Sequence, residues 1–123
     1  MSAARGSVLA GVATGQGANL TRQLVNLPGN ICTPKFLASQ ARRLARSDKN
    51  LTATIVDERK MAELGMNSLL SVGNGSEQPS QLIIIKYQGA ASSARPYCLV
   101  GKGITFDTGG ISLNPRAKMG ETK

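Results

Sequence analysis

The residues best suited to chemistry lie in one glycine-rich stretch, GKGITFDTGG, at residues 101–110. It places a lysine amine, at Lys102, five positions before a carboxylate, at Asp107. Glycines around them allow the backbone to turn sharply or to pass close to a ligand. An apolar stretch, Tyr97 to Val100, runs straight into this segment. Because ligands gather at the carboxyl ends of strands in open α/β sheets, the position favours a binding site.

Two common phosphate-binding patterns are excluded in this stretch. A Walker A loop needs Gly-Lys followed by Ser or Thr, and here Gly103 follows Lys102. No G-x-G-x-x-G pattern follows any predicted strand, so a dinucleotide fingerprint is also excluded. From the spacing alone, however, a structural turn with an exposed Lys–Asp pair is the simpler interpretation.

The chain has no histidine, which excludes Ser-His-Asp and Cys-His catalysis and every histidine-based metal site. Its two cysteines, Cys32 and Cys98, are far apart and form no CxxC pair, so a zinc finger is excluded. Both sit beside apolar residues, and we expect buried free thiols in a reducing cytoplasm. No apolar run approaches the length of a membrane span, and the N-terminus is a poor signal peptide, so we predict a cytosolic protein.

Two helices are predicted before the first strand. Leu20, Leu24 and Leu27 recur on one helical face in a stretch that begins near Ser7, and Pro28-Gly29-Asn30 stops it. Thr33 is a good N-cap with Pro34 at the first helical position, and this second helix continues through Arg46.

Strands and helices alternate along the rest of the chain. Strands are expected at 51–56, 82–87 and 97–100. A short helix is expected from Glu58 to Leu64, capped by Asp57 and closed by Gly65. Residues 68–72 are expected to form a strand or a turn of helix, and residues 74–80 a loop. Three consecutive isoleucines within LIIIKY (82–87) indicate a central strand that is buried on both faces. The sequence therefore predicts an α/β fold, with a mixed or parallel sheet flanked by helices.

Several separated segments resemble one enzyme family. GKGITFDTGGISL closely resembles the signature of the M17 leucyl aminopeptidases, also called cytosol aminopeptidases. The segments GANLTRQLVNLPGNICTP (17–34), LGMNSLLSVGNGSEQP (64–79) and LIIIKYQG (82–89) are similar to the same family's path into its catalytic domain. The resemblance implies that residues 1–123 are the N-terminal portion of that catalytic domain, incomplete and without a separate second domain.

The resemblance also implies a mechanism and partners. Family members hold two divalent metals, usually zinc, manganese or magnesium, remove N-terminal residues from peptides and assemble as homo-hexamers. By the motif match, Lys102 is a metal ligand and Asp107 binds both metals. A lysine can bind a metal only as the neutral amine, while a carboxylate is a hard oxygen ligand suited to such ions.

The sequence departs from the family pattern after Gly110. Asn114 occupies the position of the family's catalytic lysine, and an uncharged amide would stabilise a developing oxyanion less. Gly120 replaces an acidic residue, and the family's NTDAEGR segment, with further acidic ligands, is absent. We therefore expect weak or absent metal binding and no activity in this chain, interpreted as a truncated product or an incomplete sequence.

A net charge of +8 offers an alternative function. Basic residues cluster at Arg42, Arg43 and Arg46, where a non-catalytic protein could bind nucleic acid or a protein partner. No aromatic residues are interleaved with these arginines for base stacking, so a solvated helix face is the simpler interpretation.

Overall fold

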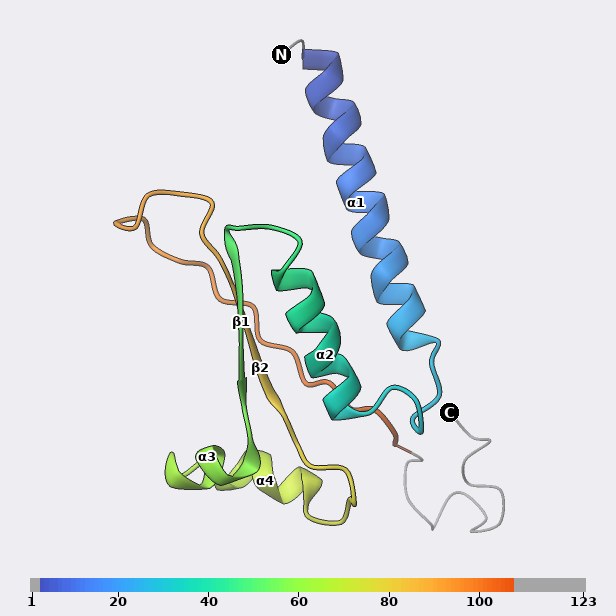
Figure 1. The fold of residues 1–123 in the computed structure, drawn as a ribbon, viewed down its shortest axis with the longest axis vertical. Coiled ribbons are helices and arrows are strands. Elements are labelled where there is room, and N and C mark those ends of the chain that lie inside the picture. The colour runs from blue at the N-terminus through green and yellow to red at the C-terminus, as the bar shows by residue number, and fades with distance from the viewer. Residues whose placement is uncertain (1–2, 108–123) are drawn as a thin grey trace.

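The computed structural model of the protein describes residues 3–107 (Figure 1). Within them, four helices and a two-stranded sheet follow the order α1 (Ala3–Val25), α2 (Pro34–Ala45), β1 (Leu51–Val56), α3 (Glu58–Glu63), α4 (Asn67–Gly73) and β2 (Leu82–Tyr87). Helix α2 packs on the sheet, α3 and α4 lie together at one end of the strands, and α1 extends away from them (Figure 1). Helices beside a sheet were predicted, and this part of the prediction is confirmed.

Helix α1 begins at Ala3, earlier than predicted, and ends at Val25, before the predicted stop at Pro28. None of its side chains is buried. Leu20 and Leu24, in its last two turns, are half-buried, whereas Val8 and Val12 are 64% and 51% exposed. Packing therefore involves the C-terminal end of α1, and the N-terminal half stands clear of the other described elements (Figure 1).

Helix α2 confirms the predicted cap. Thr33 has extended backbone angles, and its Oγ1 accepts a hydrogen bond of 3.2 Å from the Phe36 N–H. Pro34 is the first helical residue, where its missing N–H costs nothing. Ala38 and Ala41, one turn apart, are both buried, and their small side chains let α2 lie close to the sheet.

The sheet differs from the prediction in the relative direction of its strands and in how far β2 is buried. Strands β1 and β2 pair antiparallel, with Leu51 opposite Tyr87 and Val56 opposite Leu82, rather than in the parallel or mixed arrangement expected. Ile84 and Ile85 are 48% and 44% exposed, so the expected burial of β2 on both faces is wrong for the described residues. Consecutive strand residues point to opposite faces, so neither face of β2 is fully covered here.

Helices α3 and α4 connect the two strands. The predicted cap of α3 is confirmed, because Asp57 Oδ1 accepts from the Lys60 N–H at 2.8 Å and Gly65, with φ of 72°, follows the helix. Met61 is fully buried. The segment predicted as either strand or helix at 68–72 is helical, within α4.

The loop that follows α4 is also as predicted, and it is tied back to α3. Glu58 Oε1 accepts a hydrogen bond of 2.7 Å from the Ser80 N–H. Because Glu58 is the first residue of α3 and Ser80 lies just before β2, this bond joins the two ends of the connection between the strands.

Residues 88–107, here called the open segment, contain no helix or strand. Tyr97, Leu99 and Val100 are 100%, 98% and 94% exposed, so the strand predicted at 97–100 is wrong. Cys98 is exposed, which also corrects the expectation of a buried thiol, while Cys32 is buried as expected. An apolar run gains no strand hydrogen bonds without a neighbouring strand, and among residues 3–107 this run has no such neighbour. No helix among the described residues is long and apolar enough to cross a membrane.

Candidate metal site

The two candidate ligands lie at either end of the last described stretch, residues 102–107, which runs past the start of α2 to the turn that follows α1 (Figure 1). Gly103 approaches α2, since a Cβ built on it would lie 4.0 Å from Leu37 Cδ1. Ile104 and Phe106 are 45% and 48% exposed, so the stretch is partly covered rather than buried.

Gly29 lies close to this stretch. A Cβ at this position would lie 2.9 Å from the carbonyl oxygen of Thr105 and 3.0 Å from Phe106 Cβ. Both separations are tighter than ordinary van der Waals contact, so a side chain at Gly29 would push the stretch away. The absence of a side chain therefore lets the stretch lie directly on the turn, one residue before Asp107.

The turn that carries Gly29 is held by its own hydrogen bonds. The Pro28 carbonyl accepts from the Ile31 N–H at 2.9 Å and from the Cys32 N–H at 2.8 Å. Cys32, at 5% exposure, anchors the turn in the small core just before the cap of α2. The surface that receives Thr105 and Phe106 is thus fixed by local bonds and by burial.

Lys102 and Asp107 are both exposed, and the contacts of Gly103, Thr105 and Phe106 lie between them along the chain. The structure therefore holds the stretch at its middle and leaves a candidate ligand at each end. An amine nitrogen and a carboxylate oxygen are both suitable donors for divalent cations. Lys102 and Asp107 therefore fit as two of the several ligands that a metal site needs.

The described residues do not complete that site. Among them, no group of three or more His, Cys, Asp or Glu side chains is placed to hold a metal ion. Two donors from one stretch are too few for a two-metal centre, which needs several oxygen or nitrogen ligands around each ion. Asn114 and Gly120, where the sequence departs from the family pattern, lie outside the described residues.

Sequence reasoning missed the part played by Gly29. It treated Pro28-Gly29-Asn30 only as the stop of the first helix, whereas the structure shows the same turn supporting the stretch that carries the candidate ligands. The available signal was the glycine itself, because a glycine in a turn permits a close backbone approach.

Comparison with known proteins agrees with these motifs. Residues 19–123 match the model of the cytosol aminopeptidase family, catalytic domain. The chain is 55% identical over 113 residues to a probable cytosol aminopeptidase of Saccharophagus degradans, covering 92% of this chain and 23% of the relative. A second probable cytosol aminopeptidase, from Thioalkalivibrio sulfidiphilus, is 57% identical over 107 residues, covering 87% of this chain and 22% of that protein.

The match over most of the chain defines its class: a peptidase catalytic-domain sequence of the M17 type. The chain belongs to the cytosol aminopeptidase family. It spans about 23% of the length of the Saccharophagus degradans relative. Its resemblance to the leucyl aminopeptidases, first indicated by the GKGITFDTGG stretch, thus extends over nearly the whole sequence.

Proposed function

We propose that this chain contributes the first part of the catalytic domain of a metal-dependent leucyl aminopeptidase. The observation that carries the proposal is the family match across residues 19–123, which includes both Lys102 and Asp107. The substrates are peptides with a free N-terminus, and the complete protein is a cytoplasmic homo-hexamer that holds two divalent ions, manganese or zinc. By itself the chain neither closes the metal site nor hydrolyses peptides.

Within the complete protein, Lys102 and Asp107 are metal ligands. Divalent ions bound there would polarise the scissile carbonyl and provide an activated water. The contribution of this chain is to hold both donors on one stretch, supported by Leu37 and by the turn at Gly29. Such support matters because a ligand set displaced by about 1 Å loses much of its function.

Asn114 limits the activity that this sequence can support. It occupies the position of the family's catalytic lysine, which helps to polarise the substrate carbonyl. An amide can donate a hydrogen bond but supplies no positive charge, and losing one stabilising donor costs about 10²–10³ in kcat in well-studied hydrolases. Asn114→Lys should therefore raise the activity of any complete enzyme that contains this segment.

A chimera provides the test. The matching 113 residues of the Saccharophagus degradans protein are replaced by those of this chain. Hydrolysis of Leu-p-nitroanilide is then measured with added Mn²⁺. We expect slow hydrolysis, an increase of about 10²-fold on Asn114→Lys, and loss of activity on Asp107→Ala or Lys102→Ala in the Asn114→Lys background. Glu77→Ala, which removes an exposed carboxylate of the loop after α4, should have no effect.

The ligand assignment is overturned if the Asn114→Lys chimera keeps full activity after Asp107→Ala. The isolated chain gives an independent check, because we expect no Leu-p-nitroanilide hydrolysis from it with Mn²⁺ or Zn²⁺ present. Hydrolysis by the isolated chain that disappears on Asp107→Ala would refute the proposal that additional ligands are needed.

A further inference from the structure

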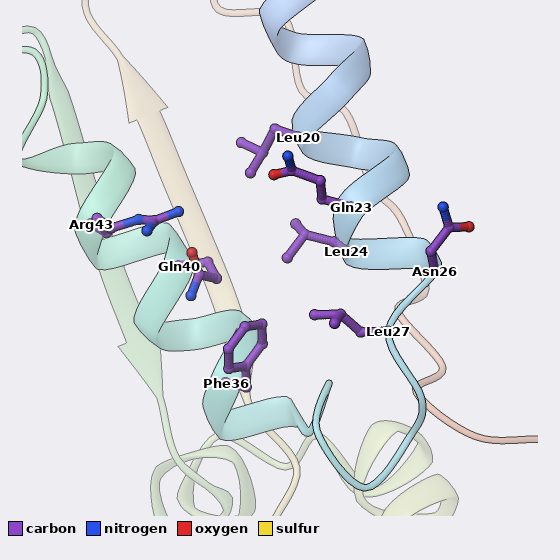
Figure 2. A pocket seen from close by; sticks show the side chains of 8 residues that line it. All are labelled: Leu20, Gln23, Leu24, Asn26, Leu27, Phe36, Gln40 and Arg43. Carbon is purple, nitrogen blue, oxygen red and sulfur yellow. The ribbon is translucent and has the colours of Figure 1, made fainter.

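An open groove of about 580 Å³ separates the C-terminal end of α1 from α2 (Figure 2). One wall comes from the end of α1 and the turn after it, where Leu20, Leu24 and Leu27 line the groove together with the polar side chains of Gln23 and Asn26. The three leucines recur at spacings of four and three, so they follow one face of the helix and the turn just after it. Residues 102–107 are not among the residues that line the groove.

The opposite wall becomes more polar along α2. Phe36, Gln40 and Arg43 recur at the same spacings of four and three, and Figure 2 shows them one above another on the side of α2 that faces α1. Phe36 lies at the end near Leu27, and Arg43 lies at the end near Leu20 (Figure 2). The groove therefore presents a row of three leucines, with two polar side chains beside them, opposite a side that ends in a guanidinium group.

Charge around the groove has one sign. Residues 3–47, which form α1, the turn and α2, contain six basic residues and no aspartate or glutamate. Within the described residues, the ion pair formed is Lys60–Glu63 on α3, and no carboxylate lies within ion-pair distance of Arg43. Arg43 is exposed, so its charge is available to a ligand.

We propose that this α1–α2 groove binds an amphipathic helix of a protein partner, with leucine-like side chains against the row of Leu20, Leu24 and Leu27 and carboxylates facing Arg43. Helices that enter grooves use anchor residues at spacings of three and four, which match the spacing of both walls. The volume holds several side chains rather than a whole helix, so the partner lies over the groove and inserts one face. Arg43 then selects partners that carry acidic residues beside the apolar stripe.

Other occupants fit less well. A second copy of this chain that docked through its own α1–α2 face would bring six further basic residues and no carboxylate to Arg43. Nucleic acid would find cations but also a wall of leucines, and one aromatic side chain, Phe36, lines the groove for stacking. The pairing of a row of leucines with a wall that ends in Arg43 therefore favours an acidic amphipathic helix.

The test uses the 123-residue chain and a fluorescein-labelled peptide of about 18 residues. The peptide carries leucines at helical spacings of three and four and glutamates on the adjacent face. Fluorescence anisotropy measures its Kd, beside a scrambled peptide of the same composition, a peptide with lysines in place of the glutamates, and a short DNA duplex. We expect the acidic amphipathic peptide to bind more tightly than the other three.

Two pairs of variants locate the binding. Arg43→Glu should weaken binding by about tenfold, whereas Arg59→Glu, the same charge change on α3, should change Kd by less than about twofold. Leu24→Gln should also weaken binding by about tenfold, whereas Leu9→Gln, on the same helix but outside the groove, should not. Circular dichroism confirms that helix content is kept in each variant.

Several outcomes would overturn the proposal. Equal binding of the scrambled peptide, or equal weakening by Arg43→Glu and Arg59→Glu, would show general attraction to a basic protein. Tighter binding of the DNA duplex than of the acidic peptide would show a nucleic-acid surface instead. Failure of the acidic peptide to bind at low salt, where such attraction is strongest, would also reject the groove as a docking site.

Discussion

Residues 33–87, here called the packed unit, and the open segment at 88–107 contain similar apolar runs but reach very different structures. Leu82–Tyr87 pairs with β1 and forms a strand. Tyr97–Val100 is also apolar, yet its Tyr97, Leu99 and Val100 side chains are 94–100% exposed. The difference teaches that an apolar run becomes a strand only where a neighbouring strand supplies hydrogen bonds.

The two regions also differ in how their elements begin and end. The packed unit has a capped helix start at Thr33, another at Asp57, and a left-handed glycine at Gly65 that closes α3. The open segment has no such local signals, and the contacts of its last residues come from Gly29 and Leu37, distant in sequence. Its path is therefore set by other parts of the molecule, as is common for loops that carry function on a rigid scaffold.

The largest effect on the free energy of unfolding is expected from a substitution of Met61, the fully buried side chain of α3. Met61→Ala should lower the free energy of unfolding by about 2–5 kcal/mol, because it removes buried contacts and leaves a cavity. Leu99→Ala, at a position 98% exposed, should change it by less than about 0.5 kcal/mol. Urea unfolding followed by circular dichroism measures both. A similar loss from Leu99→Ala would break the comparison, since it would mean that the open segment is packed.

A smaller effect is expected from the cap of α2. Thr33→Ala removes the hydroxyl that accepts from the Phe36 N–H, and should cost about 1 kcal/mol of stability. Thr14→Ala, within the exposed helix α1, serves as a matched control and should have a much smaller effect. Equal urea midpoints for Thr33→Ala and the unmodified chain would show that the cap does not define the start of the packed unit.

The smallest effect on stability is expected at the contact between the two regions. Gly29→Ala places a Cβ 2.9 Å from the Thr105 carbonyl oxygen and 3.0 Å from Phe106 Cβ. Both distances are too short for ordinary contact, so Thr105 and Phe106 must move. Since the open segment is weakly held, we expect a stability change below about 0.5 kcal/mol but clear shifts in the amide NMR signals of Thr105 and Phe106. Gly75→Ala is the control, because a Cβ at Gly75 would meet no atom within 4 Å. Unchanged NMR signals of Thr105 and Phe106 in Gly29→Ala would show that this turn does not support the stretch at residues 102–107.

Local chemistry made much of the packed unit predictable. Thr33 with Pro34, and Asp57 with Gly65, carry their signals in the residues themselves, so both short helices were predicted close to their observed bounds. The direction of β2 was not predictable in the same way, because a run of isoleucines indicates burial and says nothing of which strand lies beside it. The strand predicted at Tyr97–Val100 failed for the same reason.

The candidate site was predictable only in part. The Lys102 and Asp107 assignments come from a motif, and a motif names residues without showing what supports them. The approach of Thr105 to Gly29 joins positions far apart in the chain, and periodicity within either segment could not reveal it. Long-range packing of this kind depends on the fold as a whole.

Amide hydrogen exchange across the two regions tests the central claim most directly, namely that the candidate ligand stretch lies on a supported but open segment beside a packed unit. We expect the amides of the β1–β2 ladder to exchange at least about 10²-fold more slowly than those of residues 97–102. Equal protection of Leu82–Tyr87 and Tyr97–Val100 would contradict the account, because it would show that the second run has found a strand partner.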